Sequence, residues 1–276
     1  EHLSKTALFQ ILAGEDKAIT EILEDNNTTI STPIEVSPTY HATVEVGLPV
    51  DPVEGKKIAL AGTSVPLTGT AVKSNGQPVP FALVNIHVTL RGTLRVFSAL
   101  CNDQGKFSTT FKPLAGEAGI YDVGADHPGV ATTDAQDGFT LIGMKATPSP
   151  ASLEVIEGAD ASTTITVENL GDVALSGLTA TPSSNLPNIP NANVTLTFND
   201  PTTLPALGSR TLTCQVHAND ATYVSGTILL NVLTVEGASL TIPVAVKVVD
   251  LRPVLAPTPA KLVAAMKPDV QTLVEL

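Results

Sequence analysis

Four acidic residues, Asp122, Asp126, Asp134 and Asp137, form the densest acidic group in the sequence. Carboxylate oxygens are the ligands that Ca²⁺ prefers in proteins, so this group could form a calcium site. The spacing is not that of the regular Asp-x-Asp-x-Asp-Gly loop. Aspartate is also favoured in turns, where it accepts hydrogen bonds from the local backbone. The sequence therefore predicts no cofactor, with calcium at these four residues as the alternative to solvated turn acids.

The remaining residues that could do chemistry show no catalytic or metal-binding pattern. The five histidines have no metal-ligand spacing, and no Cys-x-x-Cys or His-Glu-x-x-His is present. Neither a Gly-x-Ser-x-Gly elbow nor a phosphate-binding glycine loop occurs. We therefore predict that the protein is not an enzyme and has no catalytic or cofactor-binding residues. The histidines are His2, His41, His87, His127 and His217.

Cysteine and aromatic residues restrict the function further. Cys101 and Cys214 are too few for a disulfide framework. They are predicted to be buried thiols, with an interdomain or intermolecular disulfide as the alternative. The chain has no Trp and only Tyr40, Tyr121 and Tyr223. Because sugar-binding surfaces usually expose aromatic rings, this composition argues against a carbohydrate-binding module.

The charge balance excludes two classes of partner. The sequence has 27 acidic and 15 basic residues, a net charge of −12. A protein that neutralises phosphates needs a basic surplus, so we expect no nucleic-acid binding. The longest apolar runs are well below the roughly 18 residues of a membrane span, so we expect no membrane insertion. The expected partners are neighbouring modules of the same protein or other copies of it.

Residues 1–31 have a different apolar spacing from the rest of the chain. Their apolar residues recur every three or four positions, which is typical of one helix face. Ser4 is a suitable N-cap. We therefore predict a short N-terminal helical segment whose apolar face needs a partner. The apolar residues are Leu8, Ile11, Leu12, Ala18, Ile19, Ile22 and Leu23.

After this segment the period changes to two, which indicates half-buried β-strands. Val84, Ile86 and Val88 alternate with polar residues, and turn sequences such as Ser74-Asn75-Gly76 separate the strands. Such strands recur at the spacing of a β-sandwich. We predict an all-β fold of tandem Ig-like sandwiches over residues 32–145 and 146–250. In the second, the proline-rich stretch 181–192 is predicted to be a connection rather than a strand.

The last residues, 251–276, contain a possible internal repeat. Ser149-Pro150-Ala151-Ser152-Leu153 resembles Thr258-Pro259-Ala260-Lys261-Leu262, at an offset of 109 residues. Repetition at one domain's spacing predicts a linker and the start of a further module. The alternative is an exchanged strand that pairs with a neighbouring copy at an open sheet edge. The candidate interaction residues in this segment are Leu262, Leu273 and Leu276.

Two resemblances to known families support the Ig-like prediction. The first comprises 75-NGQPVP-80, the strand 82-AxVxI-86, 103-DxGKF-107 and 119-GIYxV-123, and resembles bacterial Ig-like and carboxypeptidase-regulatory-like modules. The second, 167-VENLGD-172 and 204-LPALGSR-210, resembles CARDB-like modules and those appended to bacterial glycosidases. Such modules imply a spacer, stalk or adhesive element.

These observations favour a non-enzymatic structural or adhesive segment of a large secreted or cell-surface protein, acting as a stalk, spacer or filament-forming module. The alternative is a carbohydrate- or protein-binding accessory module of an extracellular enzyme. The acidic surface predicted by the composition would discourage nonspecific association.

Overall fold

The computed structural model describes residues 5–7, 10–12, 28–30, 34–36, 38–51, 55–219 and 225–249. In these ranges the regular structure is almost entirely β-strand, and the one helical element is the 3-10 turn η2 (Asn191–Asn193). The predicted all-β fold class is confirmed. No helix in the described part of the chain is long and apolar enough to cross a membrane.

The first sandwich consists of two facing sheets. One has the strand order β10-β7-β5, and the other has the order β6-β12-β11-β8-β9. All neighbours are antiparallel except β6 and β12, which are parallel. The strands are β5 (His41–Val46), β6 (Ile58–Leu60), β7 (Val65–Val72), β8 (Leu83–Leu90), β9 (Thr93–Leu100), β10 (Lys106–Phe111), β11 (Gly119–Asp126) and β12 (Asp137–Ile142).

The second sandwich has sheets of order β13-β15-β20-β18 and β14-β22-β21-β17, with a short ladder between β16 and β19. Along β20, buried Leu212, Cys214 and Val216 alternate with more exposed residues, as a half-buried strand requires. The strands are β13 (Met144–Thr147), β14 (Ala151–Ile156), β15 (Asp160–Asn169), β16 (Leu175–Ser176), β17 (Thr179–Ser183), β18 (Val194–Phe198), β19 (Thr203–Leu204), β20 (Ser209–His217), β21 (Ser225–Leu233) and β22 (Ser239–Val249).

Both sandwiches divide their first strand between the two sheets. β5 pairs with β7 in one sheet, and the chain then crosses so that β6 runs parallel to the last strand, β12. In the second sandwich β13 pairs with β15, and β14 runs parallel to β22. This arrangement and the sheet orders are those of Ig-like sandwiches.

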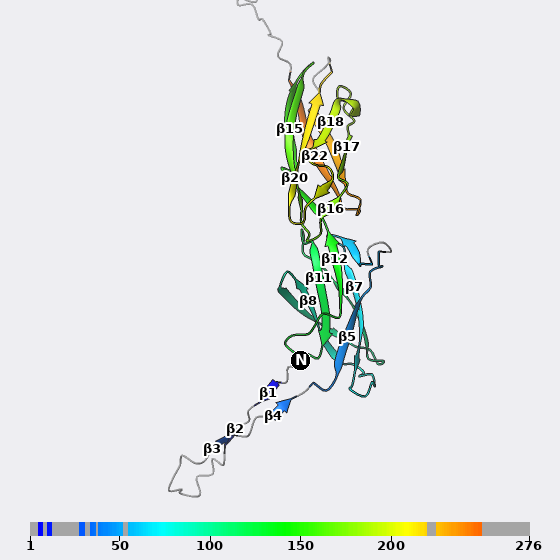
Figure 1. The fold of residues 1–276 in the computed structure, drawn as a ribbon, viewed down its shortest axis with the longest axis vertical. Helices are drawn as coiled ribbons and strands as arrows, with labels where there is room; N and C mark the ends of the chain where they lie inside the picture. Colours follow the sequence, from blue (N-terminus) through cyan, green and yellow to red (C-terminus); the bar gives the residue numbers. More distant parts are fainter. Residues whose placement is uncertain are drawn as a thin grey trace, which may run out of the picture.

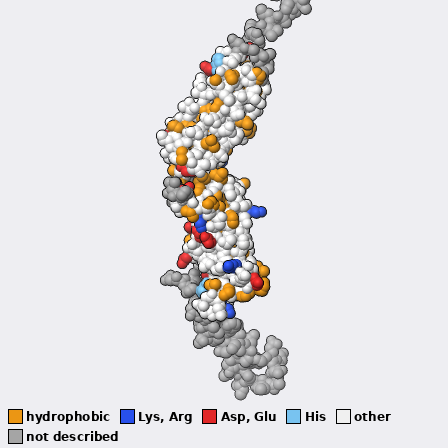
Figure 2. All heavy atoms as spheres, turned by 90° about the vertical axis from the view of Figure 1, so that its right-hand side faces the viewer, with side chains coloured by type: hydrophobic (Ala, Val, Ile, Leu, Met, Phe, Trp, Pro, Cys, Tyr) orange, Lys and Arg blue, Asp and Glu red, His pale blue; other side chains and the backbone are white. Residues whose placement is uncertain are grey.

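Each sandwich has its own hydrophobic core. The first core contains the aromatic side chains of Phe107, Phe111, Tyr121 and Phe139, whereas Phe198 is the aromatic residue buried in the second. The two sandwiches lie end to end, giving an elongated molecule (Figure 1). The face drawn in Figure 2 is mainly uncharged, with scattered hydrophobic and charged side chains.

The prediction of an N-terminal helix is wrong for those of its residues that the structure describes. Residues Lys5–Ala7 (β1) pair with Ile34–Val36 (β4), and Gln10–Leu12 (β2) pair with Thr28–Ile30 (β3). These antiparallel ladders project from one pole of the first sandwich (Figure 1). The β-branched residues of β3 and β4 favour strands, and pairing with them overrides the helical spacing. The other residues of the predicted helix lie outside the described ranges.

The prediction for residues 181–192 is wrong at its beginning. Strand β17 extends to Ser183 and contains Pro182, which lies opposite Leu230 of β21. Proline is tolerated here because β17 lies at the edge of its sheet, where no second neighbouring strand needs a hydrogen bond from its backbone. Pro187 and Pro190 lie in the connection that follows, as expected.

Candidate functional site

The candidate functional site is the junction where the two sandwiches meet. The first sandwich contributes the β8–β9 turn, formed by Arg91 and Gly92, and the start of β11. The second contributes the turn that follows β15, residues 170–173. The chain also passes directly from β12 to β13 through Gly143. Three separate segments therefore contact at this boundary, rather than a single linker.

Arg91 is the central cation of the junction. Its Nε donates to Asp172 Oδ1 at 2.5 Å, across the boundary between the sandwiches. Its Nη2 donates to the carbonyl oxygens of Ala118 and Leu170, each at 2.8 Å. One guanidinium thus binds backbone from both sandwiches and a carboxylate from the second. The planar arrangement of its donors makes this multiple contact geometrically specific.

Asp172 completes the contact on the other side. Its Oδ2 accepts a hydrogen bond from the backbone N–H of Ile120 at 3.0 Å. A Cβ added at Gly119 would lie 2.4 Å from the same oxygen, and Gly119 has a φ of +143°. The positive φ favours glycine at residue 119, and a Cβ there would also displace the carboxylate of Asp172 from its present position. Leu170 N–H donates to Gly143 O at 3.0 Å and adds a backbone bond.

Asn169 holds the turn that carries Asp172. This buried side chain accepts from Gly171 N–H at 2.9 Å and donates to the carbonyl oxygens of Val173 and Pro205, at 2.7 and 3.1 Å. The network fixes the turn before it contacts the first sandwich. The sequence motif Val167–Asp172 identified this strand end, but not its partner Arg91.

Hydrophobic side chains also cross the boundary. Leu170 of the second sandwich packs against the core of the first, and Ile58 of the first packs against the core of the second. Apolar packing and directional hydrogen bonds therefore act on the same contact. The two sandwiches are therefore joined by several contacts in addition to the covalent connection.

The four predicted calcium ligands are not gathered into one site. Among the described residues, no group of three or more His, Cys, Asp or Glu side chains is placed to hold a metal ion. Asp126 Oδ1 accepts from His127 N–H and lies 3.6 Å from His41 Nδ1. Asp134 lies in the segment between β11 and β12, with its carbonyl oxygen against Gly124, and Asp122 faces a small cavity.

The carboxylate of Asp137 accepts hydrogen bonds from three other residues. Its Oδ2 accepts from Lys57 Nζ at 2.5 Å and from Val46 N–H at 2.7 Å, while Oδ1 accepts from Gly138 N–H. Burial pushes the pKa of Asp137 up, but these hydrogen bonds outweigh burial and hold the pKa below its usual 3.8. The carboxylate therefore connects β12 to β5 and to the segment before β6.

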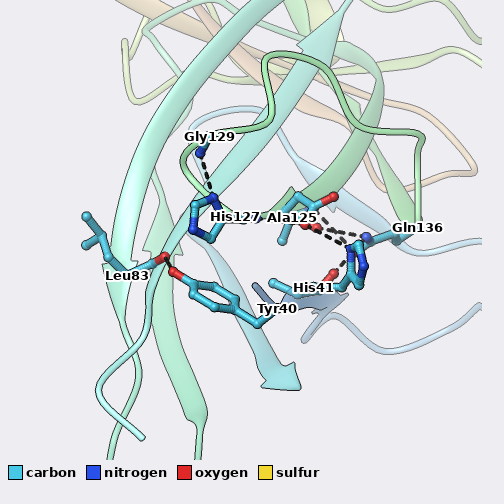
Figure 3. Close-up of polar contacts among 9 residues, drawn as sticks. Tyr40, His41, Leu83, Ala125, His127, Gly129 and Gln136 are labelled. Carbon is cyan, nitrogen blue, oxygen red and sulfur yellow. Dashed lines mark hydrogen bonds and ion pairs between the residues drawn. The ribbon is translucent and has the colours of Figure 1, made fainter. Parts of the chain in front are cut away.

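A second polar cluster joins the strands at the opposite pole of the first sandwich (Figure 3). Gln136 donates from Nε2 to the carbonyl oxygens of Ala42 and Ala125, and its Oε1 accepts from Val44 N–H at 2.8 Å. Tyr40 donates to Leu83 O at 2.6 Å. These side chains connect β5 to the facing sheet close to where the N-terminal ladders project.

His87 is a buried group that sequence reasoning did not single out. It is 5% exposed, and neither ring nitrogen has a hydrogen-bond partner among the described residues. It lies opposite Gly124 on the outer face of the sheet, beneath the segment that contains Thr133 and Asp134. A Cβ on Gly124 would lie 2.5 Å from Asp134 O, so glycine allows this covering segment to lie flat.

The other predicted residues have the following positions. Cys101 and Cys214 are buried free thiols, and burial raises the pKa of Cys214 to about 11. Tyr121 is fully buried, and burial together with Glu117 raises its pKa to about 12. Tyr223 and the candidate interaction residues lie outside the described ranges, the latter being Leu262, Leu273 and Leu276.

Comparisons with known proteins support no family assignment. No protein-family model matches the sequence. No curated protein matches it either.

Solved structures show a distant likeness. A fragment of intimin in complex with the translocated intimin receptor is 14% identical, with 73% of this chain and 62% of that fragment covered and a TM-score of 0.37. The adhesin InvE of Yersinia pseudotuberculosis is 16% identical, with coverages of 74% and 58% and a TM-score of 0.32. Salmonella α-2-macroglobulin is 10% identical, with coverages of 87% and 18% and a TM-score of 0.35.

These likenesses are weak, and the proteins concerned are of different kinds. The chain spans less than two thirds of the intimin fragment. We therefore draw the Ig-like assignment from the strand order of the two sandwiches, and we carry no activity or partner over from these proteins.

Proposed function

We propose that the chain is a non-enzymatic structural segment of a secreted or cell-surface protein, and that it acts as a stiff spacer. The observation that carries this proposal is the junction, where Arg91 and Asp172 lock one sandwich on the next. A flexible linker would let the sandwiches reorient, because interdomain contacts without such anchoring are usually weak. Contacts from three segments resist bending at this boundary.

The finer predictions are part of the same proposal. Separate cores support a division into two modules, predicted at 32–145 and 146–250, with the boundary placed at Gly143 because β13 already pairs with β15 of the second sandwich. The extracellular location, the adhesive role and the relation of the modules to carboxypeptidase-regulatory-like and CARDB-like families are proposed with it. Extension is the property that such a role needs, and the end-to-end arrangement supplies it (Figure 1).

The proposal is tested by the distance distribution between spin labels on the two sandwiches. Gln104 and Thr227 are exposed sites suitable for cysteine labelling, and the two native thiols are buried. We expect a narrow distribution in the otherwise unchanged chain and a broad one after Asp172→Ala. Glu154→Gln, which breaks the exposed Lys247 ion pair within the second sandwich, is the matched control and should leave the distribution narrow. A broad distribution before any junction mutation would overturn the spacer proposal.

A further inference from the structure

Strand β9 is an open edge of the first sandwich. It pairs antiparallel with β8 and is the last strand in its sheet order, so its other side has no neighbouring strand among the described residues. Proteins usually protect such an edge with lysine, proline or a bulge. The eight residues Thr93–Leu100 contain no lysine or proline, and they pair with β8 without interruption. The edge is therefore long, regular and unprotected within the described ranges.

The hairpin that β9 forms with β8 identifies its outward backbone groups. In a two-residue hairpin the residues that flank the turn, here Leu90 and Thr93, form a hydrogen-bonded pair, and successive residues then bond alternately to one side and to the other. Cys101 N–H donates to Ala82 O at 2.9 Å, in agreement with this alternation. The N–H and C=O groups of every second residue therefore face away from β8. These residues are Leu94, Val96, Ser98 and Leu100, and no other described residue bonds to their backbone.

The same edge exposes apolar side chains. On the outer face of the sheet, Leu94, Val96 and Leu100 are 44%, 48% and 64% exposed. On the inner face, Phe97 stacks on Phe111 at a centroid distance of 6.2 Å, beside an apolar groove between the two sheets. Both faces of β9 therefore offer apolar contacts to an added strand. Exposed apolar clusters of this kind mark interaction surfaces when they lie together on one element.

The charges at this edge permit contact between two copies of the acidic chain. The one ionisable residue of β9 is Arg95, whose Nη2 donates to Glu117 Oε2 at 2.9 Å, so the strand carries no unpaired charge. Arg91 lies before one end of β9, and its Nη1 takes no part in the junction bonds. Asp103 lies beyond the other end and is exposed, with no ion pair within the described ranges. Two antiparallel copies would bring Arg91 of each to the Asp103 end of the other, so the edge is complementary to itself in charge.

We propose that β9 of one copy pairs antiparallel with β9 of a second copy, across a two-fold axis at Phe97. In this register Leu94 lies opposite Leu100 of the second copy and Val96 lies opposite its Ser98, so every outward N–H and C=O group of the edge has a partner. The two Phe97 side chains lie opposite each other on the inner face, where aromatic cross-strand pairs are stabilising. The five-stranded sheets of the two copies then form one continuous sheet.

The two-fold axis determines the kind of assembly. The same surface of each copy is used, so the contact closes a dimer rather than extending into a filament. A single edge ladder is smaller than the roughly 800 Å² per partner of a standard interface, so we expect a weak dimer that forms at micromolar concentrations. Because β9 begins at the junction turn, its antiparallel pairing points the two second sandwiches in opposite directions. On the proposed cell-surface location, on which only this last step rests, such a contact suits molecules on facing surfaces.

Sedimentation velocity of the full chain tests the pairing. We expect a monomer–dimer equilibrium that Val96→Pro weakens by about tenfold or more, because proline removes an outward N–H from each copy and leaves the β8 ladder intact. Val96→Lys tests the same contact without altering the backbone. Its two lysines would lie close together beside the axis, so association should fall by a similar factor. Val235→Lys makes the same change at an exposed position of the second sandwich and should associate like the unmodified chain.

Disulfide trapping tests the register. A Leu94→Cys chain mixed with a Leu100→Cys chain should give a cross-linked dimer, whereas each chain alone should give almost none, because residue 94 lies opposite residue 100 and far from its own counterpart. The native thiols are buried and do not compete.

Three results would overturn the proposal. A monomer at every concentration would leave the β9 edge to an extended segment of another protein. Undiminished association of Val96→Lys would place the contact elsewhere on the chain. Absence of the cross-link from the mixture, or its presence in either chain alone, would exclude the two-fold register. None of these results bears on the spin-label test of the junction, so the two proposals fail separately.

Discussion

The two sandwiches have similar strand orders but differ in one strand. This strand is β9, which follows β8, in the first sandwich and β18, which follows β17, in the second. In the first, the chain turns at once through Arg91 and Gly92, which both have positive φ, and β9 pairs back on β8. In the second, a proline-containing connection leads away from β17, and β18 pairs with β20 instead. A two-residue hairpin turn compels the first outcome. A local turn therefore decides which sheet gains a strand, and among the described residues β10 has a neighbouring strand on one side only.

The cores differ as well, and the largest effect we expect comes from the aromatic core of the first sandwich. The Phe139 ring stacks on Tyr121 at 4.7 Å, and both side chains are buried. Phe139→Ala should lower the free energy of unfolding of the first sandwich by about 3–5 kcal/mol, because it removes buried area and leaves a cavity. Because the chain has no Trp, denaturation can be followed by tyrosine fluorescence, with Tyr121 as the buried reporter.

Phe81 provides the matched control for this prediction. It is the same residue type but is 66% exposed. Phe81→Ala should therefore change the stability by no more than about 0.5 kcal/mol. Equal losses from the two substitutions would contradict the assignment of the aromatic cluster as the core of this sandwich.

The sequence predicted features that depend on neighbouring residues better than features that depend on contacts between distant residues. Alternation in residues such as Val84, Ile86 and Val88 predicted inward-facing strand positions, and all three are buried. The Arg91–Asp172 contact joins residues 81 positions apart, and no local pattern contains it. The prediction of an N-terminal helix failed because helical spacing does not outweigh strand pairing with residues 28–30 and 34–36. Tertiary partners, rather than propensity, decided both cases.

A smaller effect is expected from the turn that distinguishes the sandwiches. Gly92 has a φ of +78°, and a Cβ there would contact nothing within 4 Å, so any cost of substitution is conformational. Gly92→Ala should destabilise the β8–β9 hairpin by about 1–2 kcal/mol. Hydrogen exchange should then accelerate in β9 more than in β18. Thr93→Ser, at an exposed β9 position, should leave exchange nearly unchanged, and an unaltered rate in Gly92→Ala would refute the importance of the turn.

The smallest expected effect is a pH dependence confined to the first sandwich. Burial lowers the pKa of His87 from 6.5, and the nearby carboxylate of Asp126 opposes this shift without reversing it. Asp122 lines the same cavity, while Thr132 and Thr133 of the covering segment contribute no charge. Because the unfolded chain then binds a proton more readily than the folded one, stability falls as the pH drops below about 6.5.

His87→Leu should remove this part of the pH dependence, because leucine cannot take up a proton and needs no hydrogen-bond partner in the buried site. Melting temperatures of the unmodified chain and the variant should therefore diverge as the pH is lowered from 7.5 to 5, with the variant the more stable. Subtracting the two curves cancels the titration of the remaining histidines and carboxylates, which both proteins share. Parallel curves would mean that His87 titrates alike in the folded and unfolded chain, and that segment 132–135 does not shield it from water. A pH-dependent difference in melting temperature confined to the first sandwich would show that burial of His87 destabilises this sandwich at low pH.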